Sequence, residues 1–280
     1  MCVILIKDYD QAIPSDELLL ACYNSNPHGL GVSIHKPNAT KIDNRKGYMT
    51  IAAMRELLTD LRENHSDSFI AFHFRFTTSG STSKGNCHPF PLLSNTTDSN
   101  KCNLTTELLK LEMFSSNMSF MHNGVIGSGD DVLDLSDTQL FVRDVLPSLI
   151  VYKDTHDIDK QKTNDNLEEY AGLSDSRFIL MAANTSTKLS VLFAGSWVIH
   201  EGYLVSNTNF VNRKTYLHKR NPFNLFDEDD YDYDYYDYVY QTCAYCASEM
   251  VRTNLDDVLM CEYCGMLDYN SEYSIKRNIT

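Results

Sequence analysis

The alternation of apolar and polar residues predicts a mixed α+β fold for the first two-thirds or more of the chain. Short apolar runs with the length and composition of strands occur at residues 2–6, 31–35, 69–76, 118–120, 178–183, 189–193, 197–200 and 203–206. Helical periodicity occurs at residues 16–24, 50–63, 104–113 and 138–149. Ser15 and Ser136 stand just ahead of two of these helices, where caps are expected. Several later strands follow one another as hairpin-like pairs, which favours antiparallel sheets over a doubly wound parallel sheet.

The composition changes after about residue 220. Residues 226–240 read FDEDDYDYDYYDYVY, in which seven of the fifteen residues are acidic and six are tyrosine. Repulsion between like charges extends such a segment, so we interpret it as a solvated linker; the alternative is a strip that binds a partner or mimics nucleic acid. We therefore expect a large domain, an acidic linker, a small cysteine-bearing module and a polar tail, at residues 2–222, 223–240, 241–270 and 271–280.

The net charge and the apolar runs exclude several classes of function. The chain has 24 basic and 38 acidic residues, and the resulting charge of −14 repels phosphate backbones, so a nucleic-acid partner is disfavoured. No window approaches the ~18 consecutive apolar residues of a membrane span. The apolar start is short and runs directly into charged residues, unlike a signal peptide. We expect a cytoplasmic protein (in the host cytoplasm, if it is viral), in which closely spaced cysteines indicate metal binding or catalysis rather than disulfides.

Cysteine at position 2 is a candidate nucleophile. Removal of Met1 would place a free α-amine beside the Cys2 thiol. This amine has a reference pKa of ~7.7–8.0, so near pH 7 a useful fraction is neutral and can accept the thiol proton. One residue would then supply both nucleophile and base. Taken alone, Cys2 is weak evidence for catalysis, and an ordinary buried cysteine is the better interpretation.

Three other segments have the chemistry that hydrolysis of an amino-acid amide requires. His122-Asn123-Gly124 follows a strand, and the Asn123 side chain and the Gly124 backbone N–H can face a developing oxyanion. Arg75 at a strand end suits the α-carboxylate of a substrate, because arginine binds carboxylates with two prongs. Asp137 at a helix start suits an α-ammonium group. Each segment also has a plainer interpretation: a common turn, a surface ion pair and a helix cap.

Together these segments resemble one family, the class II glutamine amidotransferases. The resemblance covers about residues 2–210 and extends to small stand-alone members, such as those of large bacteriophages. The matching segments, in order, are Cys2, HFRFTTSG at 73–80, NCHPF at 86–90, HNGVI at 122–126, SDT at 136–138 and the late strand EGYLVSN at 201–207.

The resemblance implies a four-layer αββα fold, that of the N-terminal nucleophile hydrolases. It implies that Cys2 attacks the side-chain amide of glutamine and forms a thioester, with Asn123 and Gly124 as the oxyanion hole. The substrate-binding residues that it implies are Arg75, Phe76, Thr78 and Asp137. No synthetase-like domain follows, so we expect the ammonia to pass to an acceptor enzyme in another chain.

Two positions depart from the pattern of the family. Ser79 stands where members often have histidine or another ring-bearing residue, so this side of the glutamine pocket is expected to differ. Cys87 interrupts an Asn-X-His-Pro segment that usually carries a small residue, and we expect it to be a buried free thiol.

The cysteines of the C-terminal module form two CXXC pairs separated by fourteen residues. This spacing is typical of a tetrahedral zinc ribbon, with ligands Cys243, Cys246, Cys261 and Cys264. Four protein ligands leave no open position, so one structural zinc ion per chain is expected. A redox-active CXXC would not explain the second pair. The module is acidic, which favours a protein partner over nucleic acid.

Two other functions remain open at the level of the sequence. An N-terminal nucleophile hydrolase could act on a different amide. A binding protein could retain the fold and engage a host complex through the zinc ribbon and the acidic strip.

Overall fold

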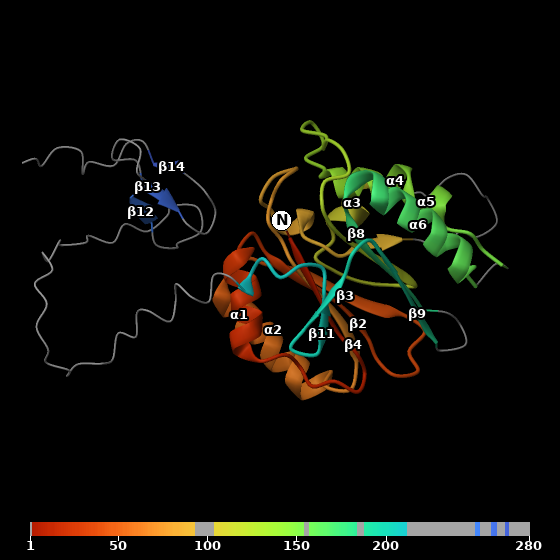
Figure 1. Ribbon diagram of the computed structural model, residues 1–280, viewed down its shortest axis with the longest axis horizontal. Helices are drawn as coiled ribbons and strands as arrows, with labels where there is room; N and C mark the ends of the chain where they lie inside the picture. The colour runs from red at the N-terminus through yellow and green to blue at the C-terminus, as the bar shows by residue number, and fades with distance from the viewer. Residues whose placement is uncertain are drawn as a thin grey trace, which may run out of the picture. The chain divides into compact units, whose positions relative to one another are not determined.

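The computed structural model describes residues 2–92, 104–153, 157–183 and 188–211, together with the backbone of three short strands between residues 250 and 268. The chain divides into two compact units, residues 1–209 and 210–280. The first unit is a mixed α+β structure with two antiparallel sheets (Figure 1). Within the described residues, every helix is too short or too polar to cross a membrane.

The larger sheet of the first unit has seven strands. Their spatial order is β10 (Val198–His200), β11 (Tyr203–Val205), β1 (Val3–Lys7), β4 (Phe69–Phe74), β2 (Leu30–His35), β3 (Ile42–Tyr48) and β6 (Met113–Ser116). All neighbours are antiparallel, and β1 lies between β11 and β4. All five residues of β1 are buried, and the first four form a continuous apolar run rather than an alternation; the fifth is Lys7.

The smaller sheet has four antiparallel strands in the order β5 (Phe90–Leu92), β7 (Met118–Asn123), β8 (Arg177–Ala183) and β9 (Leu189–Ala194). Side chains of β8 alternate between its two faces, as the pleat of a strand requires. Phe178 and Leu180 pack with helical residues in one core cluster. Ile179 and Met181 pack in a second cluster against Ile4 of β1, so the two sheets contact each other face to face.

Helices lie on both sides of the first unit. Figure 1 shows α1 and α2 on the opposite side from α4, α5 and α6. The bounds are α1 (Asp16–Ser25), α2 (Ile51–Asn64), α3 (Thr106–Lys110), α4 (Asp137–Asp144), α5 (Leu146–Leu149) and α6 (Lys160–Ser174), with a short 3-10 turn at Lys84–Asn86. Ser15 caps α1 by accepting from Leu18 N, as predicted. Ser136 forms a capping box with Gln139 at the start of α4.

A buried polar network also joins the two sheets. The hydroxyls of Ser33 on β2 and Ser119 on β7 both donate to Oδ1 of Asn44 on β3, at 2.7 and 2.8 Å. Nδ2 of Asn44 donates to Ser116 Oγ at 3.1 Å. Each of these buried groups therefore has a partner, and the network holds the sheets in one relative position.

The structure corrects several predicted boundaries. The helix predicted at 104–113 ends at Lys110, because Met113 pairs with Arg45 as the first residue of β6. The helix predicted at 138–149 is two helices that meet at Val145, where Pro147 in the first turn of α5 cannot donate to the preceding turn. The strand predicted at 69–76 ends at Phe74, and the one predicted at 118–120 continues to Asn123.

In the first unit, one helix and three strands were not predicted, namely α6, β3, β5 and β6. In β3 the buried side chains include the polar Asn44 and the charged Lys46. Its buried and exposed positions therefore do not correspond to apolar and polar residues. In α6 the buried positions are only Thr163, Leu167 and Ala171. This stripe has helical spacing but is too narrow and too polar to produce a clear periodic signal.

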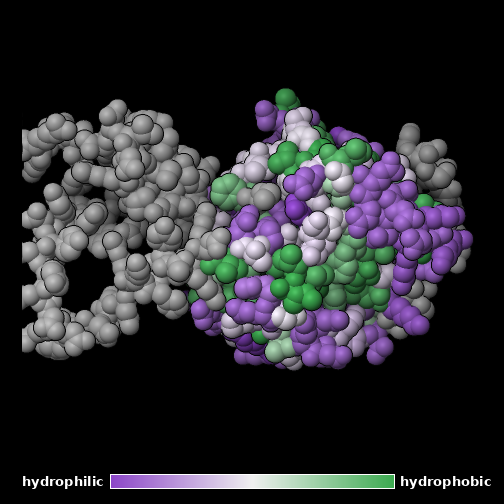
Figure 2. All heavy atoms as spheres, in the orientation of Figure 1, coloured by the Kyte–Doolittle hydropathy of each residue, from purple (hydrophilic) through white to green (hydrophobic). Residues whose placement is uncertain are grey.

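One surface feature accompanies the edge of the larger sheet. Figure 2 shows hydrophobic residues gathered over the region where Figure 1 draws β11, with hydrophilic residues around them. On β10, the edge strand beside β11, Val198 and Ile199 are 43% and 77% exposed.

The second unit contains a small antiparallel sheet. β12 (Met250–Arg252) pairs with β13 (Leu259–Cys261), which pairs with β14 (Leu267–Asp268). Of the four predicted zinc ligands, Cys261 ends β13. The other three, and the predicted linker at 223–240, lie outside the described residues.

Candidate active site

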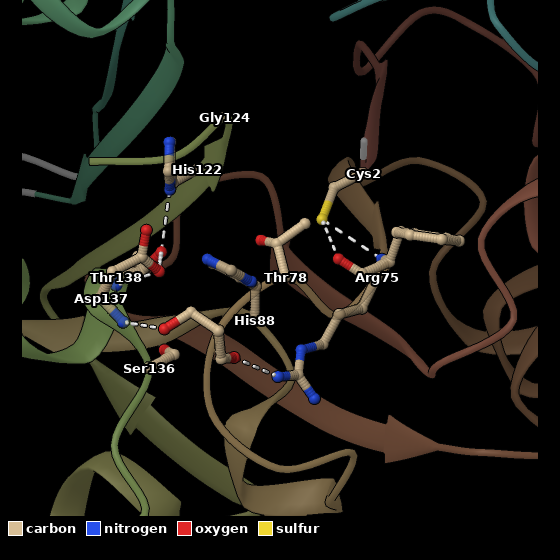
Figure 3. Close-up of a pocket in the computed structure, with 11 residues that line it drawn as sticks. Cys2, Arg75, Thr78, His88, His122, Gly124, Ser136, Asp137 and Thr138 are labelled. Atoms are coloured by element: carbon tan, nitrogen blue, oxygen red, sulfur yellow. Dashed lines mark hydrogen bonds between the residues drawn. The ribbon is translucent and has the colours of Figure 1, made fainter. Parts of the chain in front are cut away.

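A pocket opens where five segments meet (Figure 3). The space between its walls is about 290 Å³, which includes open solvent. Its walls come from the start of β1, the end of β4 and the loop after it, the segment before β5, the end of β7 with its following turn, and the start of α4. The lining residues are Cys2, Arg75, Phe76, Thr78, Ser79, His88, His122, Gly124, Ser136, Asp137 and Thr138.

Cys2 reaches the pocket because of strand pairing. β1 and β4 are antiparallel with Val3 opposite Phe74, so the residue before β1 lies beside the residues after β4. The N–H of Phe76 donates to Sγ of Cys2 at 3.3 Å, and Sγ–H donates to the Phe76 carbonyl at 3.4 Å. Nδ2 of Asn207, just beyond β11, donates to the Cys2 carbonyl at 2.8 Å. The nucleophile candidate is thus held by backbone and side chain.

The environment of Cys2 keeps its thiol protonated. Burial raises the pKa of the thiol, while the hydrogen bond from Phe76 and the charge of Arg75 lower it by less. The hydrogen-bond partners of Sγ among the described residues are the two backbone atoms of Phe76. Neither is a base, so among the described residues no side chain that could accept the thiol proton is hydrogen-bonded to Sγ.

Arg75 stands at the end of β4 with its charge in the pocket. It is only 3% exposed, and its guanidinium donates to the carbonyls of Ser79 and Ser81 at 3.0 and 2.9 Å. These bonds fix the planar fork while leaving other N–H groups for a ligand. A second side chain also holds the loop that Arg75 binds, since the carboxylate of Asp134 accepts hydrogen bonds from Ser81 N and Ser81 Oγ, each at 2.9 Å.

Asp137 faces Arg75 across the pocket from the first turn of α4. One carboxylate oxygen accepts from Ile126 N at 3.0 Å and the other from Thr138 N at 2.8 Å. The backbone N–H of Asp137 donates to Ser79 Oγ at 3.1 Å (Figure 3). The N-terminus of a helix carries a partial positive charge and attracts negative groups. The pocket therefore presents a fixed positive group and a fixed negative group.

The turn after β7 contains the oxyanion candidates. Gly124 lines the pocket with φ +152°, and a Cβ there would lie 2.3 Å from Ser176 Oγ and 2.8 Å from His122 Nε2, so only glycine fits. Asn123 does not belong to the lining. Its Nδ2 donates to Ser206 Oγ at 2.9 Å, and its buried Oδ1 has no partner.

Three buried histidines form a cluster at the site, which we call the floor: His88 and His122 line the pocket, and His73 lies behind them. His73 Nε2 donates to the His122 carbonyl at 2.9 Å, and the His73 ring stacks on that of His88 with centroids 3.9 Å apart. His122 bonds to the hydroxyls of Thr138 and Ser176. Burial lowers the pKa of His73 and of His122 to about 3, and lowers that of His88 well below its usual value. All three rings are neutral at physiological pH.

The structure brings most of the predicted site residues to one pocket: Cys2, Arg75, Phe76, Thr78, Gly124 and Asp137. Cys87 is fully buried and free, as predicted. The sequence analysis did not single out His88, His122 or Thr138 as lining residues. His28 was also missed; its Nδ1 accepts from Thr77 N at 2.8 Å and its ring stacks on Phe76. The position of His88 and His122 inside the matched segments was the one available signal.

The arrangement can bind a small zwitterion and expose it to a thiol. Among the described residues, no three or more His, Cys, Asp or Glu side chains are grouped so that they could hold a metal ion. No family model matches the chain, and no curated protein matches it at a significant level.

The neutral histidines make stability depend on pH in acid. An unfolded histidine has a pKa of ~6.5, whereas folded His73 and His122 titrate at about 3. Below pH 6.5 these two histidines bind protons in the unfolded chain but not in the folded chain. Stability is therefore fully present above pH 6.5 and is lost as pH falls, by about 1.4 kcal/mol per pH unit for each such histidine. Urea unfolding between pH 7.5 and 5 measures this slope.

The matched variant is His73→Gln, which keeps an N–H donor for the His122 carbonyl. This variant lowers the free energy of unfolding at pH 7.5. It also makes that free energy less dependent on pH, by about 1.4 kcal/mol per pH unit, which is the contribution of one histidine. An unchanged slope would contradict the assignment of His73 as a neutral buried ring.

Proposed function

We propose that this protein hydrolyses the side-chain amide of glutamine, with Cys2 as N-terminal nucleophile, as a class II glutamine amidotransferase does. The observation that carries the proposal is the single pocket in which a thiol, an arginine and an aspartate converge. Arg75 suits the α-carboxylate of glutamine and Asp137 suits its α-ammonium group. The amide end of the substrate is then directed to Cys2.

The chemistry follows from the groups around Cys2. Once Met1 is removed, the thiol proton passes to the free α-amine and the sulfur attacks the amide carbon. We assign the oxyanion hole to the Gly124 N–H, which lines the pocket, and to Nδ2 of Asn123 once its side-chain amide is turned over, since in the structure this Nδ2 donates to Ser206 Oγ. The C–N bond breaks, the nitrogen takes the proton and leaves as ammonia, and a γ-glutamyl thioester remains. Water, deprotonated by the same amine, then cleaves the thioester to glutamate and restores the thiol. The raised pKa of the thiol and the absence of a side-chain base bonded to Sγ, within the described part of the chain, support this role of the amine.

The finer fold assignment belongs to the same proposal. Two antiparallel sheets in contact, with helices on both sides, are compatible with the four-layer αββα sandwich of N-terminal nucleophile hydrolases. Released ammonia would pass to an acceptor enzyme in another chain.

The direct test is labelling with a glutamine-mimicking diazo-ketone, together with an assay of glutamate release. We expect Cys2 to be labelled, glutamine to protect it, and Cys2→Ala to abolish release. Cys22 and Cys87 are fully buried and serve as internal controls that stay unlabelled. Intact mass should also show the loss of Met1. Labelled Cys2 without glutamate release would point to a different amide, and an inert Cys2 would leave the binding-protein hypothesis.

Asp137→Asn should raise the KM for glutamine by about two to three orders of magnitude. The isosteric amide keeps an oxygen for hydrogen bonding but loses the charge that pairs with the α-ammonium group, a loss of ~3–4 kcal/mol. Asp144→Asn is the control, because Asp144 lies on the same helix in an exposed pair with Arg143. Initial-rate kinetics compare the two variants. Equal KM values would contradict the role of Asp137.

For the second unit we propose a structural zinc ribbon that binds a protein partner. The CXXC pairs support it, since one precedes β12 and the other begins at the end of β13, before β14. Both pairs have the C-X₂-C spacing that is typical of a Cys₄ zinc site.

Metal analysis of the purified chain should give one zinc per molecule. Cys261→Ser should lose the metal while glutamate release persists, because a site with four protein ligands offers zinc no vacancy for water or substrate. Cys102→Ser is the control that keeps the metal. If activity disappears together with zinc while the first unit remains folded, the division of labour between the units is wrong.

A further inference from the structure

The residue after β11, Ser206, connects the two sheets at the site. It is 2% exposed. Its Oγ accepts from Ile4 N at 2.9 Å and from Asn123 Nδ2 at 2.9 Å, and its own N–H donates to the Ile4 carbonyl at 2.9 Å. This one hydroxyl thus links Ile4 of β1 to Asn123 at the end of β7. The neighbouring Asn207 holds the carbonyl of Cys2.

More polar atoms of Ser206 and Asn123 find hydrogen-bond partners if the side-chain amide of Asn123 is turned over, that is, rotated so that Oδ1 and Nδ2 exchange places. A hydroxyl can donate one hydrogen bond and accept two. With Nδ2 directed at Ser206, the hydroxyl oxygen accepts twice, and among the described residues neither its proton nor the buried Oδ1 of Asn123 has a partner. A carboxamide has nearly the same shape in both orientations, so hydrogen bonds decide between them.

In the turned orientation Ser206 Oγ–H donates to Oδ1 of Asn123 and Oγ still accepts from Ile4 N. The NH₂ group of Asn123 then occupies the position of the unpartnered oxygen. Two buried N–H donors without a protein acceptor are costly on their own, and an anionic ligand oxygen relieves that cost.

We propose that Ser206 is a positioning residue for the oxyanion hole: it binds Oδ1 of Asn123 and thereby presents Nδ2 to the reacting carbonyl beside Gly124. The inference rests on the proposed function and extends it. Cys2 comes from the larger sheet and Asn123 from the smaller one, so the proposed nucleophile and oxyanion donor must be held in a fixed relative position. Two consecutive residues do this, because Ser206 binds the side chain of Asn123 and Asn207 binds the carbonyl of Cys2.

The test is Ser206→Ala in the full-length protein, followed by kinetics with glutamine. Losing an oxyanion donor costs about 10²–10³ in kcat, and losing only its alignment costs less, so we expect kcat to fall about 10- to 100-fold. KM for glutamine and inhibition by glutamate should stay within about twofold, because Arg75 and Asp137 are untouched. Ser206→Thr keeps the hydroxyl and should recover most of kcat. Ser25→Ala, which removes a buried hydroxyl with no partner, is the matched control.

An aldehyde analogue of glutamine separates alignment from general structural damage. It forms a tetrahedral adduct with Cys2 whose oxygen needs the same donors. In Ser206→Ala its affinity should fall by the same factor as kcat, while that of glutamate does not change. In a double-mutant cycle, Ser206→Ala should have no further effect on kcat once Asn123 is alanine, because the hydroxyl acts through that amide.

Three outcomes would overturn the assignment. Unchanged kcat and aldehyde affinity in Ser206→Ala would show that the hydroxyl does not orient Asn123. Equal losses for aldehyde and glutamate, or additive effects in the cycle, would show a general structural role. If the wild-type protein releases no glutamate, the proposed function is wrong and so is the role of Ser206. If the wild type is active, a negative result with Ser206→Ala contradicts only the role of Ser206.

Discussion

The site depends first on the backbone pairing of β1 between β11 and β4. Hydrogen bonds on both sides fix the register of this strand, and its side chains are buried on both faces. A slip by one residue would exchange the residues of the two faces and move the chain by ~3.4 Å, which is more than the site tolerates. Because the ladder ends at Val3, Cys2 stands free of the sheet yet within hydrogen-bond distance of Phe76. The reactivity proposed for the thiol therefore begins with an ordinary strand pairing.

Burial then determines which charges a ligand meets. The three histidines of the floor are neutral because desolvation lowers their pKa, and the thiol is protonated because desolvation raises its own. Arg75 and Asp137 are held in place by backbone groups and face the same pocket. In a partly dry pocket such fixed charges act more strongly than they do in water, and a zwitterion compensates both of them.

The two sheets contribute different parts of this chemistry. The larger sheet supplies Cys2 and Arg75, whereas the smaller one supplies Gly124 and leads to α4 with Asp137. Their relative position is held by the apolar cluster between the sheets and by the network around Asn44. Close to the site, Ser206 repeats this connection through Asn123. A small shift between the sheets would separate the proposed nucleophile, the proposed substrate-binding charges and the proposed oxyanion donors at the same time.

The sequence by itself determined the α+β class, the antiparallel pairing and the starts of the two helices that Ser15 and Ser136 cap, because apolar period and capping are local properties. It also pointed to Arg75, Gly124 and Asp137 through short segments with a recognisable chemistry. It did not predict β3 or α6, whose buried faces include polar side chains that find partners only in the folded protein. Nor did it predict that His88 and His122 would line the pocket or that Ser206 would meet Asn123. Those contacts join residues up to 83 positions apart, so only the packing of one sheet on the other decided them.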